Sequence, residues 1–277
     1  MSFIDAILNF AGLLLWLKWR GKGQELSARG ISLITTLKKA GPHYPRFYFP
    51  LALLMLLIAR TILYWQLGSA LDWTPQIWFG LIPLSFRSDF FWRIFLFSFV
   101  SFGAALTIFY LCLLLISILN SKRAEADPIQ NLARVQLGKL DFLPRTVKLL
   151  LPWFTMILLW CIFNKPLAAL GLLPTPKSFA HLVEQGAVAG FAIYFVWKYL
   201  IVAVLLLYLL NSYIYFGAWP FWIFIDQTAT QMLKPFSWIP LRAKKIDFAP
   251  VVAIAVIILA SEFGARGLIW IYQLLPF

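Results

Sequence analysis

Two short strings decide the fold: KLDFLP, from Lys139 to Pro144, and KIDFAP, from Lys245 to Pro250. Each string ends a basic, polar stretch and opens an apolar run long enough to cross a membrane. The similarity extends beyond them, because FYLCLLLISILN (Phe109–Asn120) resembles IVAVLLLYLLN (Ile201–Asn211) and both copies end in LLP. The sequence therefore predicts an internally repeated membrane protein built from hairpins of the same orientation.

The composition supports a membrane protein. Hydrophobic residues make up 62% of the chain and charged residues 13%, whereas soluble domains are about half apolar and about a quarter charged. Basic residues outnumber acidic ones by 24 to 11, which gives a net charge of +13. In a chain this apolar, such an excess indicates a basic side that faces an anionic lipid leaflet, and we expect no direct nucleic-acid binding.

We predict an all-α fold with about six transmembrane helices in three hairpins of the same orientation. The N-terminal hairpin occupies residues 1–93, and the two repeats occupy residues 94–174 and 187–277. The first segment precedes its basic cluster, the reverse of the order in a signal peptide, so we expect an uncleaved anchor. The six expected spans are roughly Phe3–Trp19, Phe49–Leu67, Ile94–Leu119, Leu149–Leu173, Phe191–Leu210 and Phe248–Leu274.

The loops differ sharply in charge. Loops 18–48, 120–148 and 216–247 carry seven, six and four Lys or Arg residues, which is 17 of the 24 in the chain. Loops 69–93 and 174–190, which alternate with them, carry two and one. The basic loops are therefore expected on the cytoplasmic side, and both termini outside.

Two basic loops contain amphipathic stretches. Glu25–Ala40 places its apolar residues on one helical face, and Phe221–Leu233 is a second candidate that Pro235 breaks. Both suit a helix lying on an anionic inner leaflet. The outer loop 69–93 is rich in aromatic residues that predict interfacial anchors or, alternatively, a surface for a partner: Trp73, Trp78, Phe79 and Trp92.

The repeated motif has a structural interpretation. Asp141 and Asp247 stand just before an expected helix, where a side-chain oxygen accepts a free first-turn N–H. Pro144 and Pro250 then fall in the first turn, where a missing N–H costs nothing. The alternative is a binding site for a ligand or a partner. A third copy, Phe47–Pro50, lacks the aspartate.

The second repeat resembles the YggT (YlmG) family of small membrane proteins. The resemblance rests on YIYFGAWPFWIFIDQTATQMLKPFSWIPLRAKKIDFAPVVAIAVI, and the first repeat is a weaker second copy that lacks the Leu-hinge-Pro run. The resemblance implies a role in membrane or envelope organisation. We expect a bacterial plasma (inner) membrane, with an organellar membrane as the alternative. The residues that it marks as structural or partner-binding are Asp127, Asp141, Pro144, Asp226, Leu233, Pro235, Pro240, Arg242, Asp247 and Pro250.

Four charged residues lie inside apolar runs, where charge is costly: Arg60, Lys198, Glu262 and Arg266. Arg60, Lys198 and Glu262 come from three segments at similar depth, and Glu262 and Arg266 share a helix face at i, i+4. We predict an ion-paired cluster in which Glu262 pairs with Arg266 and with Lys198 or Arg60. A proton or ion relay and a partner contact are the alternatives.

The sequence contains no recognisable catalytic, cofactor or metal motif. Cys112 and Cys161 lie in apolar runs as small hydrophobes, and His43 and His181 lie in expected loops, where they are unsuited to bind haem between helices. We therefore expect a non-enzymatic scaffold or assembly factor, with a membrane-protein partner or a second copy. The alternatives are a small ion channel or transporter, and a lipid-modifying enzyme that uses Asp226 and Asp247.

Overall fold

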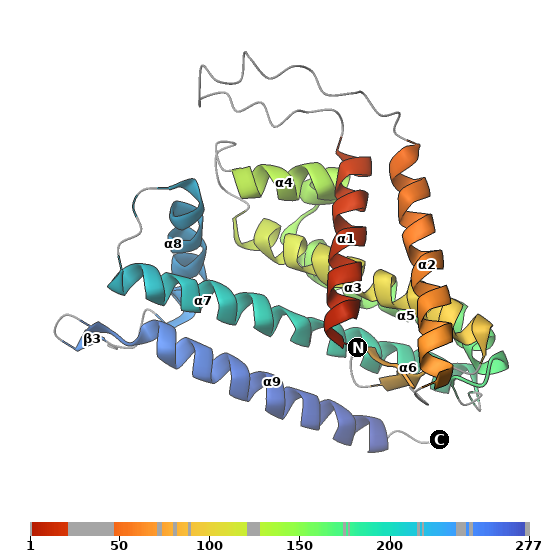
Figure 1. The fold of residues 1–277 in the computed structure, drawn as a ribbon. Helices are drawn as coiled ribbons and strands as arrows, with labels where there is room; N and C mark the ends of the chain where they lie inside the picture. Colours follow the sequence, from red (N-terminus) through yellow and green to blue (C-terminus); the bar gives the residue numbers. More distant parts are fainter. Residues whose placement is uncertain are drawn as a thin grey trace, which may run out of the picture. The chain divides into compact units, whose positions relative to one another are not determined.

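Among the residues that it describes, the computed structural model is all-α, as predicted, apart from two short β-hairpins (Figure 1). It describes residues 2–21, 47–70, 74–79, 82–87, 90–120, 128–173, 176, 178–214, 217, 219–236, 242–243 and 246–274.

Five helical segments among these residues are long and apolar enough to cross a membrane, so the chain is a multi-pass membrane protein. They belong to five of the six expected spans. The sixth, α1 (Ser2–Arg20), is not among them, because Asp5, Lys18 and Arg20 fall within its 19 residues. The five are Tyr48–Gly68 in α2 (Tyr48–Ala70), α3 (Phe91–Leu119), α5 (Arg145–Ala169), the continuous segment Phe179–Tyr213, and α9 (Ala249–Leu274).

The fourth of these segments is longer than the sequence predicted. It joins α6 (Phe179–Ala192), the 3-10 turn η3 (Ile193–Val196) and α7 (Trp197–Tyr213), so residues 179–190, expected in a loop, are helical. Ser178 caps the start, its hydroxyl accepting a hydrogen bond from the His181 N–H at 3.1 Å. This cap satisfies a first-turn donor and allows the helix to begin about three turns before Phe191, where the expected span starts.

The chain divides into two compact units, and the boundary falls within α3. Unit 1 comprises residues 1–75 and 86–106. In it α1 and α2 lie side by side and antiparallel (Figure 1). Gly12 allows α1 to approach its neighbours closely, because a Cβ there would lie 2.8 Å from the Phe102 ring.

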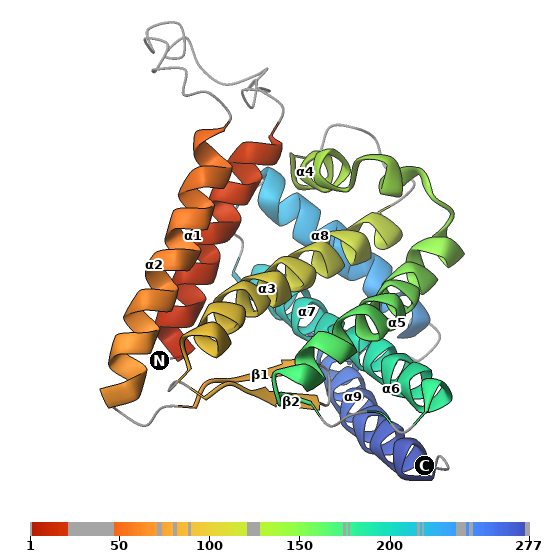
Figure 2. The same ribbon diagram turned by 90° about the vertical axis from the view of Figure 1, so that its right-hand side faces the viewer.

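Unit 2 comprises residues 76–85 and 107–277. Its apolar core joins the later part of α3 with α4 (Pro128–Leu137), α7, α8 (Pro220–Leu233) and α9 through Leu114, Ala133, Leu205, Ala229 and Ala253. Apart from this core, α5 packs extensively on α6 (Figure 2). The α5–α6 pair therefore joins the end of the first predicted repeat to the start of the second.

The loops contain short elements. The predicted helix Phe221–Leu233 is confirmed as α8, which is followed by the turn η4 (Lys234–Phe236), whereas Glu25–Ala40 lies outside the described residues. Whether α8 rests on a leaflet stays a prediction. The expected outer loop forms the hairpin β1 (Gln76–Phe79) and β2 (Ile82–Ser85). A smaller hairpin, β3 (Arg242–Ala243) with β4 (Ile246–Asp247), precedes α9.

Candidate functional site

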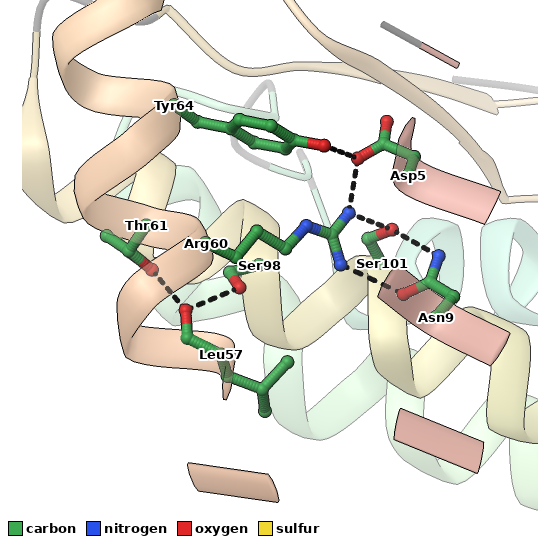
Figure 3. A network of polar contacts seen from close by, with 8 residues as sticks. All are labelled: Asp5, Asn9, Leu57, Arg60, Thr61, Tyr64, Ser98 and Ser101. Carbon is green, nitrogen blue, oxygen red and sulfur yellow. Dashed lines mark hydrogen bonds and ion pairs between the residues drawn. The ribbon is translucent and has the colours of Figure 1, made fainter. Parts of the chain in front are cut away.

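Arg60 lies at the centre of a buried polar network in unit 1, with a side chain that has no exposed surface (Figure 3). Its Nη2 donates to Asp5 Oδ1 at 2.6 Å and to Ser101 Oγ at 2.8 Å, and its Nη1 donates to Asn9 Oδ1 at 2.9 Å. Asn9 Nδ2 also donates to Ser101 Oγ at 3.0 Å, so α1, α2 and α3 meet at one guanidinium.

Aromatic groups complete this network. The Tyr64 hydroxyl donates to the same Asp5 oxygen at 2.7 Å. The Arg60 guanidinium lies over the Tyr64 and Phe97 rings, at 5.4 and 5.3 Å from their centroids. A charge-assisted pair surrounded by aromatic faces is the arrangement that makes a buried arginine tolerable.

The sequence prediction for Arg60 was wrong about its partner. We expected either Arg60 or Lys198 as a further partner of Glu262, whereas Arg60 pairs with Asp5 in the first helix. Asp5 was missed, although the rule that selected Arg60, a charge inside an apolar run, applies equally to it. Asn9, one turn further along α1, adds a second polar group on the same helix face.

A second buried cluster lies in unit 2, where the basic loop 120–148 meets α5. Lys148 is 3% exposed, and its Nζ donates to Ser117 Oγ at 2.7 Å and to the Asp141 carbonyl oxygen at 2.5 Å. The Asp141 carboxylate lies 3.4 Å from Lys148 Nζ and 3.5 Å from Arg134 Nε, and it accepts from the Ser117 hydroxyl. Asp141 therefore joins α3, α4 and α5 around one ammonium group.

The predicted capping role of Asp141 is wrong. Asp141 lies in the 3-10 turn η2 (Gly138–Phe142), and the residue that caps α5 is Pro144, with no side-chain hydrogen bond. Asp141 is three residues too early to reach the first-turn N–H groups, and its carboxylate is held by Ser117 and Lys148 instead. Pro144 therefore stands just before the helix and not within its first turn.

The other motif residues are dispersed. Pro250 is the second residue of α9, in the first turn as predicted. Asp226 is exposed on α8, and Pro235 lies in η4. Arg242 and Asp247 are Cα partners in the β3–β4 hairpin. Asp127 and Pro240 lie outside the described residues.

A third polar cluster, which sequence reasoning missed, joins α5, α6 and α9. Gln185 Oε1 accepts from Trp160 Nε1 at 3.3 Å, and its Nε2 lies 2.9 Å from His181 Nε2 and 3.2 Å from the Tyr272 hydroxyl. His181 was expected in a loop but is buried on α6. His181 and Gln185 are four residues apart, a spacing that brings two side chains together on a helix. The sequence could have indicated this contact only if the helix had been predicted to begin at residue 179.

The predicted pair between Glu262 and Arg266 is confirmed. Arg266 Nε and Nη2 lie 3.2 and 3.1 Å from Glu262 Oε1. The side chains are 57% exposed for Glu262 and 70% for Arg266, so this pair faces outward from α9. The expected link to Lys198 is absent from the described residues, where the Lys198 ammonium lies over the Tyr199 ring at 5.1 Å.

The four intramembrane charges that the sequence grouped together thus have three different local environments. Arg60 is buried in unit 1, Glu262 and Arg266 are exposed on α9, and Lys198 contacts an aromatic ring on α7. Among the described residues, no group of three His, Cys, Asp or Glu side chains converges as a metal site would require. The chain matches no protein-family model, no curated protein and no solved structure.

Proposed function

We propose that this protein is a non-enzymatic scaffold or assembly factor of the bacterial plasma (inner) membrane. Its proposed role is to bind other membrane-spanning helices and organise them. The observation that carries the proposal is the exposed Glu262–Arg266 pair within the last span, α9.

An exposed ion pair in a span is energetically unfavourable in lipid. A charged side chain at the centre of a spanning helix costs about 2.5–3.5 kcal/mol on insertion scales. The Arg60 cluster shows how the same fold avoids this cost, by enclosing the charge among three helices. A partner helix over Glu262 and Arg266 would enclose the second pair in the same way.

The burial of the spans supports the same proposal. In α9, only 6% of the most apolar 18-residue stretch is buried within the chain. The corresponding share for α3 is 33%. The most apolar 18-residue stretch of the continuous span Phe179–Tyr213 is 11% buried. Lipid covers most such surface in any membrane protein, so the low burial alone is weak evidence, but on α9 it coincides with the charged pair.

The resemblance to the YggT family supports a role in membrane organisation. The order long helix, short helix, long helix occurs as α3–α4–α5 and again as α7–α8–α9, as two tandem units would require. The basic loops that contain α4 and α8 are proposed to face an anionic inner leaflet.

Photo-crosslinking in native membranes tests the scaffold proposal. A photoreactive phenylalanine analogue replaces Phe263, which is 65% exposed on α9, or Phe154, which is 57% exposed on α5, as the matched control. We expect a discrete membrane-protein adduct at position 263 that is much weaker at position 154. Adducts that are equal at the two positions, or adducts with lipid alone, would overturn the proposal.

A small transporter or proton relay is the second candidate, and the Arg60 network favours it. Tyr64, Asp5 and Arg60 form a continuous hydrogen-bonded chain between α1 and the span α2. The purified protein in liposomes, assayed for proton and ion flux with Arg60→Met as the control, separates the two candidates. Flux that Arg60→Met abolishes would favour the relay.

A further inference from the structure

One face of α9 combines the exposed pair with large apolar side chains. Leu259, Phe263 and Trp270 are 55, 65 and 63% exposed, and they lie with Glu262 and Arg266 at spacings of three and four residues. This spacing places all five on one side of the helix. We call these five residues the α9 face. Pro250 and Ala253, which are buried, belong to the opposite side.

The Glu262–Arg266 pair determines which hydrogen-bonding groups a partner of the α9 face must supply. Both hydrogen bonds from Arg266 go to the same carboxylate oxygen, Glu262 Oε1. The second carboxylate oxygen and the remaining guanidinium N–H groups are therefore available to a neighbour. The neighbour must supply one donor and one acceptor, about one helical turn apart, without adding net charge.

We propose that the α9 face binds the same face of a second copy of this chain, in a parallel dimer with its two-fold axis along the membrane normal. Two copies inserted with the same orientation bring their α9 helices together in parallel. Glu262 of each copy then lies about 6 Å along the axis from the partner's Arg266, within reach of both side chains. The four groups form a neutral network, and the apolar members of the α9 face pack around it.

Charge complementarity favours a second copy over an unrelated helix. A partner with a single charged residue would leave one unbalanced charge in the hydrocarbon, whereas a second Glu–Arg pair balances all four. The same surface supplies both the donor and the acceptor, which is the defining property of a two-fold interface. The inference deepens the scaffold proposal and rests on it in taking the α9 face as a docking surface.

Cysteine cross-linking in membranes tests the dimer. In the full chain with Cys112→Ala and Cys161→Ala, Leu259→Cys places a thiol on the α9 face, and Leu158→Cys, 61% exposed on α5, is the matched control. We expect mild oxidation to give a disulfide-linked dimer for Leu259→Cys and about tenfold less for Leu158→Cys. Equal yields, or no dimer at position 259, would overturn the proposal.

Charge reversal tests the role of the pair. Glu262→Arg, added to Leu259→Cys, places four cations at the interface, and because arginine keeps its proton the dimer yield should fall by about tenfold. Adding Arg266→Glu restores one acid and one base per copy and should return most of the yield. Thermal unfolding in detergent checks that each variant is folded. A folded Glu262→Arg variant with an unchanged dimer yield would overturn the proposal.

The outcomes also separate this inference from the scaffold proposal. A photo-adduct of Phe263 with a different membrane protein, without a dimer at position 259, would overturn the dimer and leave the scaffold in place. If photo-crosslinking at position 263 gave the dimer as its sole adduct, the result would support the inference. It would also remove the support for a different membrane protein as the partner.

Discussion

The Asp5 carboxylate lies 2.6 Å from Arg60 Nη2, and this contact joins α1 to the span α2. The pair is enclosed, with side-chain exposures of 19% for Asp5 and 0% for Arg60. The Glu262–Arg266 pair is also a carboxylate with a guanidinium, but both of its side chains are more than half exposed. The first pair is therefore enclosed within the fold, whereas the second is the pair for which we propose an interaction surface.

Removal of Asp5 alone should be strongly destabilising. Asp5→Ala leaves the Arg60 guanidinium buried without its carboxylate, and the expected loss in the free energy of unfolding is about 3–5 kcal/mol. Arg60→Met should cost less, because Asp5 keeps the hydrogen bond from the Tyr64 hydroxyl and is partly exposed. The double variant should cost less than the sum of the two single changes. Thermal unfolding in detergent measures the cycle, and additive losses would contradict the pairing.

Asp141→Asn distinguishes the observed ion cluster from the helix cap that the sequence predicted. An asparagine caps a helix about as well as an aspartate, so a capping residue would tolerate the change. An asparagine cannot neutralise the buried Lys148 ammonium, so we expect a loss of about 2 kcal/mol or more. Lys148→Met in the Asp141→Asn background should recover part of this loss. A neutral Asp141→Asn variant would restore the capping interpretation.

The sequence predicted the class and most spans because long apolar runs can be recognised without tertiary contacts. It predicted the pair within α9, Glu262 with Arg266, but not the partner of Arg60, since matched depth along separate helices does not fix which helices are neighbours. Matched depth made Arg60 one of two candidate partners of Glu262, beside Lys198, whereas Arg60 contacts α1. The capping prediction for Asp141 failed for a related reason: the motif fixed the position in the sequence, and the 3-10 turn changed where the carboxylate lies.

The α5–α6 contact depends on a glycine. A Cβ at Gly190 would lie 2.7 Å from Trp153 Cδ1 and 3.1 Å from the Trp153 carbonyl oxygen. We therefore expect Gly190→Ala to destabilise the protein by about 1–3 kcal/mol through overpacking. Gly103, in α3, is the matched control, because nothing lies within 4 Å of its added Cβ. Gly103→Ala should be neutral or stabilising by up to about 1 kcal/mol, and equal losses at the two positions would contradict close packing at Gly190.

The charge asymmetry of the loops predicts which side of the membrane they face. In a chain without native cysteines, Phe142→Cys and Lys234→Cys lie in the basic loops, and we expect an impermeant maleimide to label them only after the membrane is opened. Gln76→Cys, in the opposite loop, should be labelled in intact cells. Met55→Cys, 64% exposed but within the span α2, is the control and should react poorly from either side. Labelling of Phe142→Cys in intact cells would reverse the assigned orientation.

The position of the N-terminus follows from the contacts of Asp5. Asp5 binds Arg60 and Tyr64, in the half of α2 that leads to Gln76, so the start of α1 lies at that end of α2. Phe3→Cys, at a site that is 75% exposed, should therefore be labelled from the same side as Gln76→Cys. Adding Asp5→Ala removes the contact that holds the start of α1 against α2, so we expect Phe3→Cys labelling in intact cells to fall while Gln76→Cys labelling does not change. Unchanged labelling of Phe3→Cys would mean that α1 crosses the membrane without the ion pair, and that Asp5 and Arg60 contribute to stability alone.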